Sequence, residues 1–354
     1  MEQNRNPGAE QQPHKRRVRY KGTHPRKFEE KYKELNPEKY GNDVEKIIGQ
    51  GKTPAGMHIS IMVNEILDFL QIQPGQTGYD ATLGYGGHSR RMLECLQGEG
   101  HLYATDVDPI ESEKTRQRLA DLGFGPEILT IKRMNFADLD KVAPGKKFDF
   151  ILADLGVSSM QIDNPDRGFT FKHDGPLDLR LDPTAGVSAA QRLRELDREE
   201  LVNMLVENSD EPYAEEIARA VLKTFKKKQP IDTTRQLYAV IEQALSFLPD
   251  LERKEAVKKS CQRTFQALRI DVNSEFEVLY AFLEKLPTVL KSGGRVAVLT
   301  FHSGEDRLVK QAFKQGVRDG VYSDAARDVI RPSAEECFRN PRARSTKMRW
   351  AILA

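Results

Sequence analysis

The chain has 354 residues, 38% of them hydrophobic and 31% charged, and its formal net charge is +2. This length and composition predict a water-soluble protein with one main core and a smaller second one. No apolar run is long enough to cross a bilayer, and the first residues lack the apolar stretch of a secretion signal. We therefore expect a cytoplasmic protein without a membrane partner. The cysteines Cys95, Cys261 and Cys337 are far apart in the chain, which fits a reducing compartment and predicts no metal site.

The N-terminal segment is polar and basic. Residues 1–13 are rich in Gln, Asn, Pro and Gly and predict disorder, whereas residues 28–40 predict a short charged helix. Between them, residues 15–27 combine many Lys and Arg residues with Tyr20 and contain no acidic residue. Such an arm suits RNA phosphates, but it suits a solvated tail equally well. Residues 339–350 are basic too, and two basic ends on a near-neutral chain favour a polyanionic partner.

The middle of the chain alternates between helix and strand patterns. Apolar residues recur at helical spacing from Met57 to Leu70, which predicts a helix that packs on the core. Strand patterns then alternate with helical ones at 78–83, 101–108, 127–134, 147–156 and 295–301. This alternation predicts an α/β fold with a largely parallel, doubly wound sheet, in which ligands bind beyond the carboxyl ends of the strands. We expect one rim of the sheet to carry Gly84 to His88, Asp106, Asp154 and His302.

A glycine-rich turn follows the first predicted strand. Residues 81–88 read ATLGYGGH and lead into a helical pattern, and Asp106 and Asp108 stand at the end of the next strand. Glycines let the backbone approach a ligand, a helix N-terminus offers free N–H groups, and an acidic side chain about 20 residues further on can hold ribose hydroxyls. The turn predicts an adenosine-containing cofactor, although short glycine clusters also serve ordinary turns.

Asp154 follows an apolar strand pattern directly, and a turn of small residues then leads to Gln161. Asp is common as a cap after a strand, but the position at the rim favours a ligand-binding carboxylate. The segments DRGFTF (166–171) and GPLDLRLD (175–182) lack helical or strand periodicity, and long polar loops are often functional.

Between about Met160 and Ser260 helical periodicity replaces the strand pattern. Residues 214–228 and 234–248 each place their apolar residues on one face, and Thr233 begins a capping-box pattern. We therefore predict an all-helical insert. The lysines at 226–228 fit a solvated helix end better than an RNA contact. The predicted division of the chain is an extension (1–53), a first core part (54–160), the insert (161–259) and a second core part with the basic C-terminus (260–354).

Seven motifs carry a specific resemblance. In chain order they are ATLGYGGHS, ADLGVSSMQID, DRGFTF, GPLDLRLD, RTFQALRIDVN, GGRVAVLTFHSGEDR and NPRARSTKMR. Together they resemble the bacterial 16S ribosomal RNA cytosine-N4 methyltransferase family, also called RsmH or MraW. The resemblance extends from about Met57 to the C-terminus and leaves out the basic arm.

The resemblance implies a Rossmann-like core with an inserted helical domain and S-adenosyl-L-methionine as cofactor. The implied target is the exocyclic amine of a cytosine in small-subunit ribosomal RNA, near the decoding centre. Ribosomal RNA or the small ribosomal subunit is the implied partner, and the oligomeric state, a homodimer included, is left open. Carried over motif by motif, the cofactor residues are Gly86, Gly87, His88, Asp106, Phe136, Asp154 and Gln161.

Each of these cofactor residues has a physical role in the assignment. The glycines admit the methionine end of the cofactor, Asp106 accepts hydrogen bonds from the ribose, and Phe136 offers a face to adenine. Asp154 and Gln161 meet the polar amino-acid end.

Methyl transfer to a cytosine amine needs alignment more than it needs a protein nucleophile. Because the lone pair of the amine is delocalised into the ring, an acceptor that pulls on its N–H bonds assists attack. Asp154 is the first candidate for this catalytic acceptor and His302 the second, although His302 fits a structural hydrogen bond within FHSGEDR slightly better.

The target base must leave its stack to reach the pocket. Aromatic rings suit the base and arginines suit phosphates, but the same rings also fit a loop anchor and the same arginines fit pairs with nearby Asp residues. The RNA-binding candidates are Arg167, Phe169, Phe171, Arg180, Arg342 and Arg344.

The chain departs from the family pattern at three places. The usual HSLEDR reads HSGEDR with Gly304, YGEE reads NSDE at 208–211, and LDMRMD reads LDLRLD. With the basic arm, these changes leave open a paralogue with a shifted RNA target or an inactive RNA-binding assembly factor. A DNA amine methyltransferase is disfavoured because ADLGVSS lacks the Asp/Ser/Asn-Pro-Pro-Tyr/Phe signature. A nicotinamide dehydrogenase is disfavoured most, since Ser89 replaces the third fingerprint glycine.

Overall fold

A computed structural model describes residues 60–354, all of which belong to one compact unit, His58–Ala354. The basic arm, the predicted helix at 28–40 and the start of the predicted helix at Met57 lie outside the described residues. The rest of that helix is present as α3 (Val63–Leu70). Within the described part, no helix is long and apolar enough to span a membrane. The three cysteines are free.

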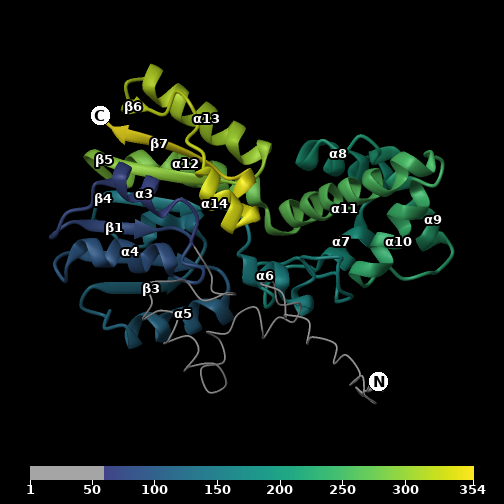
Figure 1. Ribbon diagram of the computed structural model, residues 1–354, viewed down its shortest axis with the longest axis horizontal. Helices are drawn as coiled ribbons and strands as arrows, with labels where there is room; N and C mark the ends of the chain where they lie inside the picture. The colour runs from purple at the N-terminus through teal and green to yellow at the C-terminus, as the bar shows by residue number, and fades with distance from the viewer. Residues whose placement is uncertain (1–59) are drawn as a thin grey trace, which may run out of the picture. The chain divides into compact units, whose positions relative to one another are not determined.

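One seven-stranded sheet forms the centre of the molecule, with the strand order β3-β2-β1-β4-β5-β7-β6 (Figure 1). The five predicted strands are confirmed and run parallel to one another. Their bounds are β1 (Thr77–Asp80), β2 (His101–Asp106), β3 (Leu129–Arg133), β4 (Phe148–Asp154) and β5 (Leu290–Thr300). The chain winds outward from β1 in both directions, so a switch point lies between β1 and β4, where such sheets bind ligands.

Two further strands complete the sheet and were not predicted. β7 (Lys347–Leu353) pairs antiparallel with β5, and β6 (Tyr322–Ala325) pairs antiparallel with β7. β7 was missed because its basic residues are typical of a surface segment. In the structure Arg349 is buried and its guanidinium reaches the carboxylate of Asp306 at 2.6 Å. Part of the basic C-terminal segment is therefore internal structure.

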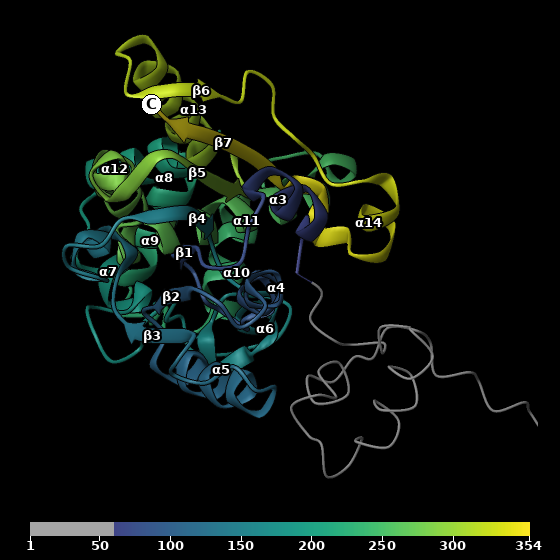
Figure 2. The same ribbon diagram turned by 90° about the vertical axis from the view of Figure 1, so that its left-hand side faces the viewer.

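Helices cover both faces of the sheet (Figure 2). On one face, Phe150 and Leu152 pack with apolar residues of α3, α4 (Gly87–Leu96) and α5 (Pro109–Asp121). On the other face, Tyr79 and Ile151 pack with residues of η2 (Phe136–Lys141), α12 (Glu275–Val289) and α13 (Ser303–Arg318). Alternate residues of one strand thus enter opposite cores, as the two-residue period of a strand requires.

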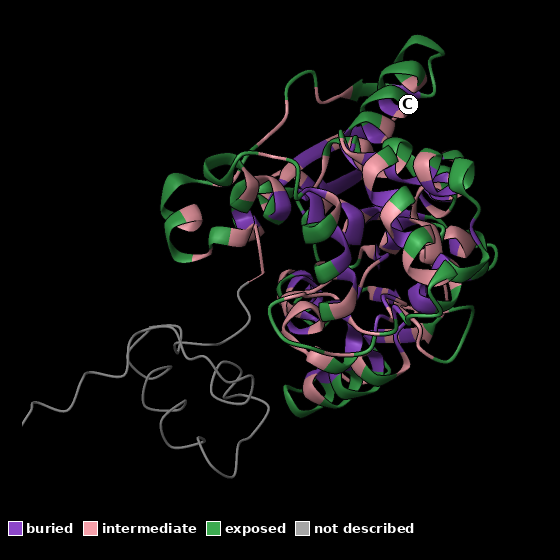
Figure 3. Ribbon diagram, turned by 90° about the vertical axis from the view of Figure 1, so that its right-hand side faces the viewer, coloured by how far each residue is buried: buried purple, intermediate pink, exposed green. Residues whose placement is uncertain are grey.

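The helical insert has a core of its own, and the helices that face the viewer in Figure 3 alternate between buried and exposed residues. The two predicted helices are confirmed as α9 (Ala214–Lys226) and α10 (Thr234–Ala244), and the capping box before α10 is present. They pack with α7 (Ala189–Glu195), α8 (Arg198–Ser209) and α11 (Asp250–Asn273). The boundary predicted at 259/260 falls inside α11, which runs unbroken from the insert toward the sheet.

Candidate cofactor and active site

A cavity of about 370 Å³ lies at the carboxyl ends of the parallel strands. Its walls come from the β1–α4 turn, the ends of β2 and β4, η2, α6 (Ser159–Asp163) and the α11–α12 junction. Seven residues predicted from the sequence line it together: Gly86, Gly87, His88, Asp106, Phe136, Asp154 and Gln161. Segments far apart in sequence therefore meet at one site, and the individual roles of these residues stay predictions.

The glycines of the turn are required by packing against the protein itself. Gly86 has φ +82°, and a Cβ there would lie 2.6 Å from Thr115 Cγ2. A Cβ on Gly87 would overlap the hydroxyl of Ser60. The turn thereby sets the start of α4 against the cavity wall with no side-chain cap on its N-terminus. Free N–H groups and the positive end of a helix dipole suit a carboxylate ligand.

Asp154 has one carboxylate oxygen with no partner. Its backbone N–H donates to Thr82 Oγ1 at 2.7 Å, and its Oδ2 lies 3.4 Å from Nδ1 of His88. Oδ1 is buried and, among residues 60–354, accepts no hydrogen bond. An unmet buried acceptor is costly in a folded protein, and the Asp154 side chain lines the cavity, so its carboxylate suits a donor or a cation that enters there. Burial raises the pKa of Asp154 to about 6, against an opposing attraction from His88.

His88 links Asp154 to the segment before α3. Its Nε2 lies 2.9 Å from the carbonyl oxygen of Ile61, which can only accept, so Nε2 carries a proton. Nδ1 on the other side of the ring faces the Asp154 carboxylate. His88 therefore joins the segment before α3 to the end of β4 beside the cavity.

The carboxylate of Asp106 already accepts two hydrogen bonds from neighbouring backbone. Its two carboxylate oxygens accept from the backbone N–H groups of Gly84 and Asp108, each at 2.8 Å. Burial raises the pKa of Asp106 to about 6. Each oxygen retains a second lone pair for a hydroxyl donor, so the predicted contact with a ribose is compatible with the geometry.

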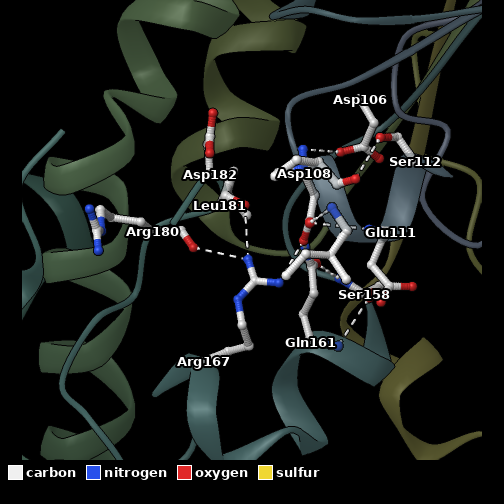
Figure 4. A network of polar contacts seen from close by, with 12 residues as sticks. Asp106, Asp108, Glu111, Ser112, Ser158, Gln161, Arg167, Arg180, Leu181 and Asp182 are labelled. Atoms are coloured by element: carbon white, nitrogen blue, oxygen red, sulfur yellow. Dashed lines mark hydrogen bonds and ion pairs between the residues drawn. The ribbon is translucent and has the colours of Figure 1, made fainter. Parts of the chain in front are cut away.

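Sequence reasoning missed a buried ion pair behind the cavity wall (Figure 4). Asp108, completely buried, caps α5 and accepts from Arg167 Nη1 at 2.6 Å and from Gln161 Nε2 at 3.0 Å. Arg167 also donates to the carbonyl oxygens of Arg180 and Leu181. The available signal was the Asp-Pro pair at 108–109, which is typical of a helix start.

Two more residues beside the glycine turn were also missed. Asp80 is buried at the end of β1 and accepts from Ser89 Oγ at 2.6 Å, which joins β1 to α4. Thr82 positions Asp154 through the bond described above. Both belong to the stretch DATLG, and their polar side chains next to the turn were the signal.

Five of the six side chains predicted to contact RNA have partners within the protein. Arg180 pairs with Asp178 and Arg342 with Asp163, at 2.7 and 2.6 Å. Phe171 stacks on Tyr238, and Phe169 packs against the core of the insert. Arg344 is exposed on η4 (Pro341–Ser345). For Arg167, Arg180 and Arg342 the geometry favours pairing with a carboxylate over contact with phosphate. For the two phenylalanine rings it favours anchoring of the loop.

His302 caps α13 and does not line the cavity. Its Nδ1 accepts from the N–H of Glu305 at 3.5 Å, and its Nε2 lies 3.2 Å from Glu305 Oε1 without a hydrogen-bond geometry. This is the structural role that the sequence left open. Glu275 lies nearby and could join the two as metal ligands, but Arg269 holds both of its oxygens at 2.7 and 2.9 Å. The guanidinium supplies the cation at this cluster.

The departure at Gly304 has a visible compensation. A Cβ at this position would lie 2.7 Å from Cζ of Phe276, so the ring occupies the space of the missing side chain. In the NSDE segment, Glu211 is buried and accepts from Ser260 Oγ at 2.8 Å. The changed motifs are thus packed into the structure.

The family model described as the MraW methylase family matches residues 55–353. The chain belongs to this family. "Ribosomal RNA small subunit methyltransferase H 1" of Lachnoclostridium phytofermentans is 67% identical over 98% of this chain and 96% of its own length. The protein of the same name from Agathobacter rectalis is 67% identical over 98% of this chain and 99% of its own. The resemblance stated from the motifs is confirmed.

One solved structure illustrates how remote the structural relatives are. An rRNA methylase from Streptococcus thermophilus aligns with a TM-score of 0.40 at 13% identity, over 84% of this chain and 98% of that chain. No conclusion about the site follows from this likeness.

As a member of the MraW methylase family, the chain is an S-adenosylmethionine-dependent methyltransferase. Independently of the family, the groups that line the cavity suit that cofactor. The uncapped start of α4 suits a carboxylate, the unpartnered oxygen of Asp154 suits a cationic or donor group, and Asp106 suits hydroxyls. The enzyme class expected from the motifs is confirmed.

Replacing Gly86 with alanine should weaken S-adenosylmethionine binding in this MraW family member. The new Cβ would collide with Thr115 and hold a left-handed backbone, so the start of α4 would shift. The matched control is Gly98→Ala, which has φ +81° and open space around the Cβ. Both variants bear about 1 kcal/mol of backbone strain, and calorimetric titration should find lost affinity in Gly86→Ala alone. Equal affinities would show that the turn does not set the site.

Proposed function

We propose that this chain transfers a methyl group from S-adenosylmethionine to the exocyclic N4 amine of a cytosine in small-subunit ribosomal RNA. The observation that carries the proposal is the carboxylate of Asp154, which lines the same cavity as the cofactor residues and has one buried oxygen, Oδ1, without a hydrogen-bond partner among the described residues. The names and near-complete coverage of the two relatives support the choice of RNA as substrate. We place the reaction in the cytoplasm, with ribosomal RNA or the small subunit as partner.

When bound, the cofactor supplies an electrophilic methyl group on a sulfonium centre. The carboxylate of Asp154 accepts a hydrogen bond from the amine N–H, which returns electron density to the nitrogen. The bond from Asp154 N–H to Thr82 fixes the end of β4 and so the direction of the carboxylate. The methyl group would leave the sulfonium as the N–C bond forms, the electron pair of the broken S–CH3 bond staying on sulfur as a neutral thioether. The amine nitrogen then has a surplus proton, which passes to the carboxylate of Asp154, whose Oδ2 lies 3.4 Å from Nδ1 of His88. Gln161, held by Ser158 and Asp108, closes one wall.

Cofactor affinity should fall as the pH drops through about 6. Burial raises the pKa of both Asp106 and Asp154 to about 6, so each is ionised above that pH and neutral below it. The ionised forms are the better acceptors for hydroxyls and for a cationic ligand, and their loss weakens binding. Titration calorimetry between about pH 5 and pH 8 checks this, because the range extends about one unit below and about two units above the two pKa values. A constant affinity across that range would contradict the assignment.

Mass spectrometry of 16S ribosomal RNA tests the proposed function. Digests from a strain lacking the gene are compared with those of the parent and of the strain carrying the gene back. One cytidine should lose its N4-methyl group in the deletion and regain it on complementation. Identical modification in all three strains would refute the ribosomal RNA assignment.

A further inference from the structure

The exposed face of α13 carries a row of cations. At about 100° per residue, Arg307, Lys310, Lys314 and Arg318 fall within a sector of about 80°, which excludes the core-facing side chains of Val309 and Phe313. All four are exposed. We call this set the α13 stripe.

The α13 stripe is not neutralised by the protein. Among residues 60–354, none of its four side chains forms an ion pair, and the acidic residues of the helix, Glu305 and Asp306, are buried on the core side. The cations of the neighbouring segment behave differently, since Lys347 and Arg349 both pair with Asp306. Four like charges in one row repel one another, so an anionic partner would relieve this repulsion as well as form new ion pairs.

The helix that carries the stripe starts at the rim of the cavity. Phe301 and Glu305 line the cavity, and Arg307 follows in the second turn of α13. With a rise of about 1.5 Å per residue, the stripe extends about 16 Å from Arg307 to Arg318. α13 follows the edge of the sheet beside β6 and β7 and points away from the helical insert (Figure 1).

We propose that the α13 stripe binds the phosphates of ribosomal RNA next to the target cytosine, an inference that rests on the proposed function. Lys and Arg without interleaved aromatic rings recognise charge and spacing, not base sequence. A base drawn into the cavity leaves its strand at the rim, and α13 starts at that rim, so we infer that the strand continues along the exposed face of this helix. The stripe holds the substrate in register while the cavity carries out the reaction.

The test compares two triple variants of the full chain that remove equal charge. Arg307→Gln, Lys310→Gln and Lys314→Gln remove most of the stripe, whereas Lys223→Gln, Lys226→Gln and Lys227→Gln remove three exposed lysines at the end of α9. The probe is small ribosomal subunits from a strain lacking the gene. Binding is measured across a salt series, with methyl transfer at saturating subunits and cofactor affinity measured in parallel.

The stripe variant should bind about tenfold or more weakly at physiological salt, and its plot of log affinity against log salt should flatten by about 2, at about 0.7 per lost contact to a single strand. The rate at saturation and the cofactor affinity should stay at the wild-type value. An unchanged slope, or an equal loss in the α9 variant, would overturn the inference even if methylation proceeds. If the salt slope flattened in the stripe variant but the wild type methylated no cytosine, RNA binding by the stripe would be supported and the proposed reaction would be rejected.

Discussion

Asp154→Asn should lower kcat by about 10² to 10⁴-fold, the range associated with removing a group that handles a proton in the transition state. Asparagine has nearly the same shape, and the backbone bond from residue 154 to Thr82 Oγ1 does not depend on the carboxylate. The amide, however, is a weaker acceptor and takes no proton. Single-turnover methylation of subunits from a deletion strain measures the loss, and cofactor titration separates it from weaker binding.

Asp149→Asn on the same strand is the matched control. Asp149 lies at the opposite end of β4, where it accepts from Thr77 N–H and Lys291 Nζ. Its replacement should lower stability slightly and leave kcat unchanged. If Asp154→Asn turned over at the wild-type rate, alignment alone would account for catalysis and the acceptor role would be wrong.

Arg167→Met should destabilise the protein by about 3–5 kcal/mol, the usual cost of removing one partner of a buried ion pair. The side chains of Arg167 and Asp108 are 9% and 1% exposed, so the carboxylate would be left without its cation in a dry site. Chemical unfolding followed by fluorescence measures the change. Hydrogen exchange should locate it at the start of α5 and in the loop around Arg180, because Arg167 joins both.

Two further variants separate structure from RNA binding. Asp108→Asn combined with Arg167→Met should be more stable than Arg167→Met alone, because no charge is then buried without a partner. Arg180→Met, which breaks a half-buried pair with Asp178, should cost less. Wild-type stability of Arg167→Met together with a flatter salt dependence of RNA binding would restore Arg167 as a phosphate contact.

The cofactor rim could be predicted from sequence because its signals are local. The glycine turn, Asp106 and Asp154 each follow a strand pattern, and parallel strands bring such positions to one edge. The five parallel strands and the helices of the insert were predictable for the same reason, since their apolar periods are written in consecutive residues.

The parts that were missed depend on pairing between distant segments. Nothing near Arg167 in the sequence shows that its partner is Asp108, and nothing near Arg349 shows that Asp306 neutralises it inside the sheet. A charged side chain has the same sequence signature whether it faces water, RNA or a buried carboxylate. The stripe on α13 was overlooked because its four cations are not consecutive in the sequence. They share one face only once the helix has formed and its exposed side is known.

The insertion between β4 and β5 also affects the order in which this enzyme folds during translation. The two strands are hydrogen-bonded neighbours, yet β4 ends at Asp154 and β5 begins at Leu290. During synthesis, the first four strands leave the ribosome long before β5, and the insert can form its own core in the interval. The active cavity, which needs Glu275 and Phe301 as well as Asp106, closes only near the end of translation. Nascent chains should therefore be unable to hold cofactor until almost the whole polypeptide has emerged.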